Sequence, residues 1–582
     1  KFDIDTFTRE DLFKVMSAVH ENKAEMEKLC DEDKRLVIKV IDGFLNNGLA
    51  LPKEEKEKLK KMRKDLSDME INFAQNISAD KSKILFTREE LAGLPESFFE
   101  DRELEVVDGV KKYVVTTKYP DLLPVMGYAK CEETRQRLSI LNNTRCPENV
   151  EILQKAVCMR REAAKLLGYK NHAELALKNK MAKTPENVMQ FENDLLAKLT
   201  VIAKQEIKEF ERLKKQDKEA AGKKYEGLFS WDFSYYNNKL KEEKYSIDNE
   251  EIKQYFSLEK VVPGILKIYE DMLSLHFVKV DNPPVWHPDV EMYEAWEADK
   301  QTFVGHFYLD MYPRDDKYSH AAMFPLRNGA IKPDGSFEYP SAALVTNFPK
   351  PTSTTPALLT HDDFETLMHE LGHVFHHICS HTRWAEFFGT SVQRDFVEAP
   401  SQMLENWAWE PSVLQRMAVH YKTGEVMPES LMNNLIAARY VNSGISNLNQ
   451  VFYGLYDMKI HMSEKDDINV SELYNKLRSE ISFFKSGMTK TWGVATFGHI
   501  MGGYVAGYYG YLWSKVFSAD MFEARFKKEG LFNEQTGIDY RKEVLLPGGS
   551  RDAEISLEKF LGRKPQNTAF LKAIGLDSVE SA

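Results

Sequence analysis

The chain has 582 residues, more than one hydrophobic core usually serves, so the sequence predicts two large lobes. Hydrophobic residues make up 43% and charged residues 29%, as in globular proteins, and the net charge of −12 argues against nucleic acid or an anionic membrane as the main partner. Five cysteines without a CxxC pair favour a reducing compartment over a disulfide framework.

Helical spacing of apolar residues predicts most elements of the first 250 residues. This spacing is found over residues 11–44, 53–76, 149–167 and 185–213. Residues 104–115 are typical of a β-hairpin, because the Asp108-Gly109 dipeptide favours a tight two-residue turn. The polar run 214–227 is expected to be a long surface loop.

After about residue 250 the pattern changes. Residues 302–312 and 339–348 are typical of strands, and the turn Pro333-Asp334-Gly335 precedes the second of them. A helical segment with several histidines follows, and the chain then reads as mainly helical to its end. Segment 492–513 has no acidic or basic residue except His499, but its six glycines and four tyrosines argue against a membrane span.

The most informative motif is His369-Glu370-x-x-His373. Positions i and i+4 of a helix share one face, so both imidazoles can bind one zinc ion. Glu370 lies beside the first ligand, where its carboxylate can reach a metal-bound water. Catalytic zinc takes three protein ligands and leaves one position open. The alternative interpretation is an amphipathic helix with surface histidines.

The third ligand is not decided by spacing. A third histidine of the extended motif is excluded, because the chain has His376 and Cys379 where that motif requires Gly and His. A downstream segment offers carboxylates at Asp395, Glu398 and Glu405, of which the last two lie two helical turns apart on one face.

Other residues near the motif have candidate supporting roles. Pro400 suits the first turn of a helix, which places Glu398 near its start. Glu365, one turn before His369, is a candidate acceptor for the ring N–H that faces away from the metal. Asp362 and Asp363 are expected to cap the histidine helix. Three further histidines are expected to be solvated or packed rather than ligands, namely His376, His377 and His381.

Longer blocks at 305–314, around His369, and at 394–407, 497–499 and 508–513 resemble the thimet oligopeptidase, neurolysin and saccharolysin family of zinc peptidases. The resemblance covers nearly the whole chain. By position it puts the zinc ligands on His369, His373 and Glu398, and the catalytic carboxylate on Glu370. The family's histidine and tyrosines on a glycine-rich loop fall on His499, Tyr504, Tyr508 and Tyr511.

The resemblance implies a mainly α, zincin-like fold: a two-lobed helical clam-shell with a deep central channel and a small β-sheet next to the histidine helix. Residues 1–250 would form the distal wall of the channel, and residues 251–582 the catalytic lobe, with about 508–550 packing back onto the first lobe. The family's first helices are expected to be missing, because His369 comes early in the chain.

The implied function is that of an endopeptidase with one Zn²⁺ per chain, which hydrolyses internal peptide bonds of short oligopeptides. Glu370 would act as general base and acid, while His499, Tyr508 and Tyr511 would stabilise the oxyanion. Tyr504, Gly502 and Gly503 are expected to bind substrate, on a loop that closes over the peptide.

Strand residues 341–345 are expected to pair with the peptide backbone. A cytoplasmic or also mitochondrial monomer is expected, with no nucleic-acid or membrane partner. Two alternatives stay open: a catalytically silent peptide-binding protein of the same fold, and a helical protein with a structural zinc that has Cys379 as fourth ligand.

Overall fold

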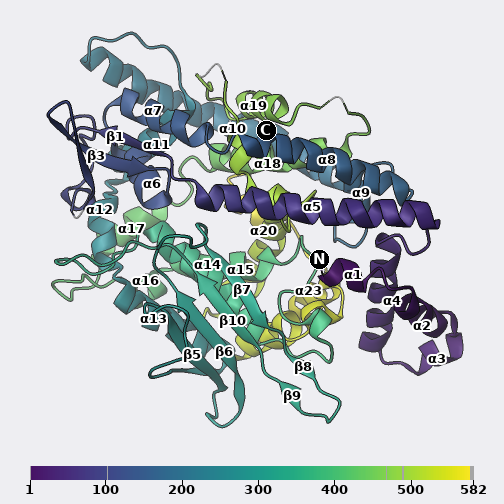
Figure 1. The fold of residues 1–582 in the computed structure, drawn as a ribbon. Coiled ribbons are helices and arrows are strands. Elements are labelled where there is room, and N and C mark those ends of the chain that lie inside the picture. The colour runs from purple at the N-terminus through teal and green to yellow at the C-terminus, as the bar shows by residue number, and fades with distance from the viewer. Residues whose placement is uncertain (1, 101, 467, 488–489, 577–582) are drawn as a thin grey trace.

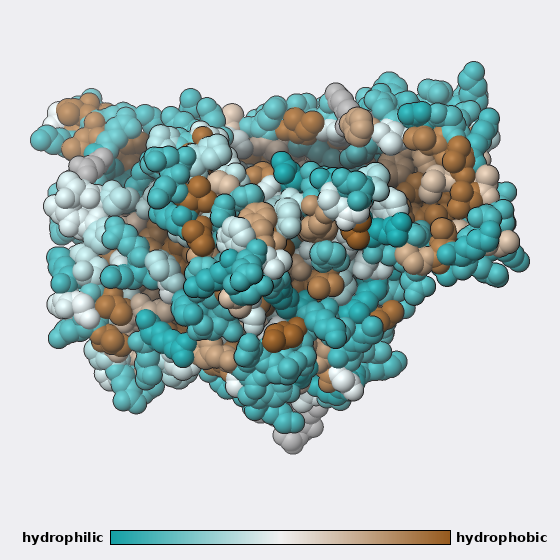
Figure 2. Space-filling view, turned by 90° about the horizontal axis from the view of Figure 1, so that it is seen from below, coloured by the Kyte–Doolittle hydropathy of each residue, from teal (hydrophilic) through white to brown (hydrophobic). Residues whose placement is uncertain are grey.

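The computed structural model describes residues 2–100, 102–466, 468–487 and 490–576. It is mainly α with small β-sheets, as predicted. Figure 1 shows long helices in its upper part and a sheet with shorter helices in its lower part. None of the helices in the described ranges has the length and apolar character needed to cross a membrane. The face drawn in Figure 2 is mostly hydrophilic, and its hydrophobic residues form several groups, with the largest at the upper right of the view.

The long helices follow the predicted spacing. They are α5 (Lys53–Ala79), α8 (Glu148–Leu166) and α10 (Pro185–Ala220). The predicted helix at 11–44 is instead divided into α2 (Glu10–Glu21), α3 (Lys23–Lys28) and α4 (Asp31–Asn46). The divisions fall where the side chains of Asn22 and Cys30 accept hydrogen bonds from the first turn of the next helix. Side-chain caps of this kind start new helices.

The surface loop predicted at 214–227 is wrong for its first half, because α10 continues to Ala220. Lys214 is fully buried, and its Nζ donates to Glu132 at 2.7 Å and to Asp232 at 2.5 Å. A buried ammonium needs such partners. Lys214 therefore belongs to a buried ion network, whereas Lys215, Gln216 and Glu219 on the same helix are exposed.

The predicted hairpin is confirmed. Its strands β2 (Leu104–Val107) and β3 (Val110–Thr116) are joined by Asp108 and Gly109, with φ of 52° and 79°. Both angles lie in the left-handed region that the tight hairpin turn requires. Strand β1 (Lys83–Phe86) completes a sheet of order β1-β3-β2.

The larger sheet has the order β4-β5-β6-β10-β7. Its strands are β4 (Leu275–Lys279), β5 (Glu291–Glu297), β6 (Phe303–Asp310), β7 (Ala322–Arg327) and β10 (Ser341–Val345). Only β6 and β10 are predicted from the sequence. Because β10 pairs with β6 on one side and with β7 on the other, the prediction that it pairs with a peptide is wrong. The outer strands of this sheet are β4 and β7.

The remaining helices surround this sheet or join the long helices. Those that matter for the site are α6 (Tyr119–Tyr128), α13 (Leu258–Leu273), α14 (His361–Ile378), α15 (Glu398–Glu405), α18 (Ser443–Met462), α19 (Val470–Ile481) and α20 (Gly510–Met521).

Two large hydrophobic cores hold these elements. One is built from residues 247–438 and 521–560 around the sheet. The other combines residues 66–240 with 445–512 and 570–576. The chain therefore returns to the core of the long helices after about residue 440. The predicted division at residue 250 and the packing of residues 508–550 stay predictions.

Candidate metal and catalytic site

Helix α14 carries the histidine motif and begins with a reciprocal cap. Thr360 Oγ1 accepts from the amide of Asp363 at 3.1 Å, and the Asp363 carboxylate accepts from the amide of Thr360 at 2.9 Å. This capping box fixes where the helix begins. It confirms the capping role expected for Asp363. One face of α14 packs into the core around the sheet, while His369 and His373 line a cavity.

Helix α15 approaches α14 closely because Gly372 lies between the two histidines. A Cβ atom on Gly372 would come within 2.8 Å of the Cα atom of Ser401. Only glycine allows this separation of the two backbones. Pro400 lies in the first turn of α15, so Glu398 is at its start, as predicted. The close approach brings the Glu398 carboxylate opposite both histidines.

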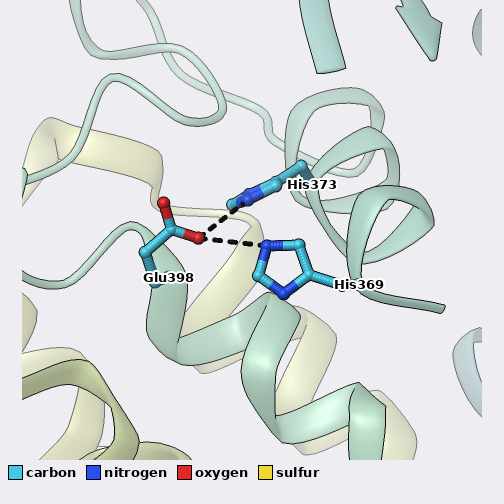
Figure 3. Close-up of side chains that lie close together, drawn as sticks. All are labelled: His369, His373 and Glu398. Atoms are coloured by element: carbon cyan, nitrogen blue, oxygen red, sulfur yellow. Dashed lines mark hydrogen bonds and ion pairs between the residues drawn. The ribbon is translucent and has the colours of Figure 1, made fainter. Parts of the chain in front are cut away.

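The three side chains converge on one point, as Figure 3 shows. Glu398 Oε2 lies 3.0 Å from His373 Nε2 and 3.2 Å from His369 Nε2. These ligand atoms lie within 4.8 Å of one another, and no other group of three or more in the described ranges could hold a metal. Burial opposes ionisation of Glu398, but the two imidazoles bring its pKa well below its usual value.

Cys379 does not belong to this group. It is buried just beyond the end of α14, where burial raises the pKa of its thiol to about 11. A thiol of this kind is a poor metal ligand, since zinc binds the thiolate. The arrangement therefore disfavours a fourth protein ligand from Cys379.

A carboxylate also supports the ring of His369, but it is not the predicted one. His369 Nδ1 lies 2.7 Å from Glu405 Oε1. The Glu365 carboxylate instead accepts from Trp409 Nε1 at 2.6 Å. The expectation for Glu365 is therefore wrong, because its side chain packs against the indole of Trp409.

Glu370 is buried, with 7% of its surface exposed, and its Oε2 has no hydrogen-bond partner among the described residues. Burial raises the pKa of this carboxyl group, while the imidazoles of His369 and His373 oppose the rise. A carboxyl group with a raised pKa and an unpaired oxygen is suited to accept a proton and to return it.

Residues 498–511, called the glycine-rich segment from here on, line the same cavity and end in the first turn of α20. The ring of His499 lies 5.2 Å from that of Tyr508 and 5.8 Å from that of Tyr511, measured between centroids. Tyr504 donates a hydrogen bond to Glu398. Burial raises the pKa of all three tyrosines well above the usual value and lowers that of His499. The phenols therefore stay protonated and can donate.

All predicted site residues line a single cavity of about 1030 Å³. They are His369, Glu370, His373, Glu398, His499, Gly502, Gly503, Tyr504, Tyr508 and Tyr511. The structure thus brings together side chains from α14, α15 and the glycine-rich segment. The edge strand β7 lines the same cavity through Ala322, Met323 and Pro325.

The model of "Peptidase family M3" matches residues 125–576 of the chain. The chain belongs to peptidase family M3. It is 39% identical to the thimet-like oligopeptidase of Dictyostelium discoideum, over 99% of this chain and 87% of that protein. It is also 39% identical to saccharolysin of Saccharomyces cerevisiae, over 99% and 83%. Oligopeptidase A of Escherichia coli is 32% identical, over 93% and 81%.

Solved structures share the fold at low sequence identity. PZ peptidase A with an inhibitor aligns over 98% of this chain and 84% of its own, with a TM-score of 0.56 and 14% identity. The M32 carboxypeptidase of Deinococcus radiodurans aligns over 97% and 87%, with a TM-score of 0.52 and 13% identity. Peptidases of family M3 are metallopeptidases, and the group on α14 and α15 could hold the metal.

The sequence does not predict several of the residues that line the cavity of this M3 chain. Tyr318 and His320 follow β6 in an irregular segment, and Arg394 precedes α15. The Tyr119 hydroxyl, from the first turn of α6, lies 3.0 Å from His320 Nδ1 across the cavity wall. Tyr318 and His320 lie shortly after the block 305–314, and Arg394 is the first residue of the block 394–407. Their place in or beside these blocks could have indicated all three. Tyr119 carries no such signal.

Proposed function

We propose that the chain is a zinc-dependent endopeptidase that hydrolyses internal peptide bonds of short oligopeptides. The observation that carries the proposal is the convergence of His369, His373 and Glu398 in a large cavity beside Glu370. Two imidazoles and one carboxylate are the ligand set of many catalytic zinc sites, which leave a fourth position open. The names of the relatives, all oligopeptidases or saccharolysin, support the same activity.

The three ligands would hold one zinc ion per chain. When bound, zinc acts as a Lewis acid and lowers the pKa of a water ligand towards about 7. Glu370 takes the proton from the attacking water and later delivers it to the leaving amine. Its raised pKa and its unpaired Oε2 suit both transfers. Glu405 keeps the ring of His369 in position through Nδ1.

His499, Tyr508 and Tyr511 would donate hydrogen bonds to the oxyanion that forms at the attacked carbonyl. Donors placed in advance at such a position are each worth roughly 3–4 kcal/mol in the transition state. Tyr508 donates to Gln450 at 3.0 Å in this structure, so it would exchange that bond for one to the substrate. Tyr504, Gly502 and Gly503 would contact the peptide beside the reacting bond.

The substrate is held as an extended strand. Strand β7 is an outer strand of the sheet and lines the cavity, so its backbone can pair with a peptide without reading its sequence. A cavity of about 1030 Å³ lies at the upper end of the usual range for small-ligand sites, which favours short peptides over folded proteins. The monomeric state and the cytoplasmic location stay predictions.

The test is a quenched fluorescent peptide, assayed with and without a metal chelator, beside the Glu370→Gln variant. We expect the wild type to cleave the peptide internally, the chelator to stop cleavage, and zinc to restore it. The variant should keep its zinc and lose turnover by about 10²- to 10⁴-fold. Cleavage that survives chelation would refute a zinc peptidase, and peptide binding without turnover in the zinc-loaded wild type would identify a silent binding protein.

A further inference from the structure

The side chain of Asp457 lies behind the glycine-rich segment, on α18, with none of its surface exposed. Its Oδ1 accepts from the amide of Ala506 at 2.9 Å. Its Oδ2 accepts from the amides of Gly507 at 2.7 Å and Tyr508 at 2.9 Å. One carboxylate therefore binds three consecutive backbone amides of the segment that carries the tyrosines.

The backbone at this point has an unusual conformation. Ala506 has a φ of 47°, in the left-handed region that residues with a Cβ disfavour. Successive amides turned inwards in this way form a concave site for an anion. Because the Asp457 carboxylate is that anion, it compensates for the disfavoured conformation. Removing the charge should therefore let the segment relax.

A chain of buried polar groups supports Asp457. His461 lies one turn further along α18, and its Nδ1 is 2.8 Å from Asp457 Oδ1. Arg160, from α8, places Nη1 3.3 Å from His461 Nε2. Since an arginine can only donate, His461 Nε2 is the acceptor of this bond. The ring proton of His461 therefore lies on Nδ1, which donates to Asp457. Arg160 Nη2 donates to Glu70 on α5 at 2.9 Å, and the Glu70 side chain is partly exposed.

Two cationic side chains, Arg160 and Lys180, also bind carbonyl oxygens of the glycine-rich segment. Arg160 Nη1 also donates to the carbonyl oxygen of Ile500 at 2.8 Å, next to His499. Lys180 Nζ donates to the carbonyl oxygen of Ala506 at 3.2 Å. Charged groups buried in this way gain little stability over a well-packed apolar core, so their value lies elsewhere. Both halves of the segment are fixed by side chains that never reach the cavity.

We propose that Asp457 is a positioning residue for the peptidase reaction, which sets the backbone at residues 506–508 so that Tyr508 faces the cavity beside His499. This inference rests on the proposed function. It also limits the expected closing movement to one part of the glycine-rich segment. Residues 506–508 stay fixed on α18, and only the exposed turn at Gly502 and Gly503 adapts to the peptide.

The first experiment compares Asp457→Asn with wild type on a quenched fluorescent peptide. Asparagine keeps the size of the side chain. Its NH₂ group, which can only donate, would replace Oδ2, the oxygen that accepts from the amides of Gly507 and Tyr508. We expect kcat to fall at least tenfold, KM to change less than threefold, and the zinc content to stay at one per chain. Asp232→Asn is the matched control, because Asp232 is equally buried but belongs to the ion network of Lys214. It should lower the unfolding temperature and leave kcat unchanged below that temperature.

A double-mutant cycle tests whether Asp457 acts through Tyr508. If it does, Tyr508→Phe should cost much less in the Asp457→Asn background than in wild type, because both changes remove the same contribution. Additive losses, or an unchanged kcat in Asp457→Asn, would overturn the inference. If Asp457→Asn does not fold, His461→Leu takes its place in the cycle, with an expected fall in kcat of about threefold to tenfold and the same non-additivity.

Hydrogen exchange gives a readout that needs no turnover. The amides of residues 506–508 should exchange slowly in wild type and at least tenfold faster in Asp457→Asn, with α18 itself unchanged. Equal exchange in both proteins would overturn the inference even if the chain cleaved no peptide. A wild type that lacks peptidase activity but shows the exchange difference would refute the proposed function alone.

Discussion

The Nδ1 atom of His369 lies 2.7 Å from Oε1 of Glu405, while Nε2 of the same ring faces Glu398 at 3.2 Å. A carboxylate bound to one ring nitrogen fixes the tautomer and presents the other nitrogen to a metal. Glu405 therefore supports the metal site from the far end of α15. This one helix supplies both the candidate ligand Glu398 and the carboxylate that orients the ligand His369.

Replacing Glu405 by Gln is expected to weaken zinc binding about 10- to 100-fold, because the ring loses its charged acceptor. Competition with a chromophoric chelator measures this affinity. Glu365→Gln is the matched control, since Glu365 lies one turn from His369 but bonds to Trp409. Equal zinc loss in both variants would mean that Glu405 has no special role.

The hydroxyl groups of Tyr508 and Tyr511 are expected to act only in the transition state. Tyr508→Phe and Tyr511→Phe should each lower kcat by well over tenfold with zinc retained, since each removes one donor to the oxyanion. Steady-state kinetics and metal analysis provide the measurement. Tyr509→Phe is the control: Tyr509 donates to Asp395 at 2.8 Å in the protein interior, so its loss should affect stability only. Normal kcat in the first two variants would exclude them from the mechanism.

Gly372→Ala is expected to force α14 and α15 apart. The new methyl group would meet the backbone of Ser401 at 2.8 Å, and a backbone atom cannot turn away as a side chain can. Overpacking of this kind costs about 1–3 kcal/mol of stability. The shift should also move Glu398 away from the histidines and weaken zinc binding. Unfolding curves with and without zinc measure both effects, and a variant equal to wild type in both would show that the helices can separate freely.

The sequence predicts those parts of the site that depend on local spacing. His369 and His373 share a face because any helix places residues i and i+4 together, and the sequence around them is helical. The Asp108-Gly109 turn follows from backbone preferences of two residues. The choice of Glu398 over Glu405 as third ligand needed the family resemblance, because both residues lie on the same face of α15.

Long-range contacts decide the rest, and no local pattern reveals them. Lys214 continues a helix because Asp232 and Glu132 reach it in the core. Glu405, and not Glu365, supports His369 because α15 crosses α14 at Gly372. The sequence leaves β10 as a possible edge strand, but in the structure β7 pairs with it. Asp457 is unremarkable among the polar residues of α18 until its three amide partners are known.

The stability of the protein in acid is expected to depend on His361, the first residue of α14. This residue is 5% exposed, and its Nε2 lies 2.8 Å from the carbonyl oxygen of Ala408. Burial lowers its pKa from 6.5 to about 4. Between these two values the unfolded chain binds a proton that the folded chain excludes. The free energy of unfolding therefore falls as the pH falls, by about 1 kcal/mol per pH unit for this group.

His361→Gln keeps an N–H donor near the position of Nε2 and removes the titrating group. Above about pH 7.5 the imidazole is neutral in both states, so the two proteins should differ there by a constant amount. From pH 6.5 to 4.5 the variant should lose about 1–2 kcal/mol less than wild type. Denaturant unfolding with chelator present measures this without zinc release, and the other buried histidines cancel because both proteins contain them. Parallel stability curves over this range would mean that His361 accepts its proton in the folded protein as readily as in the unfolded chain.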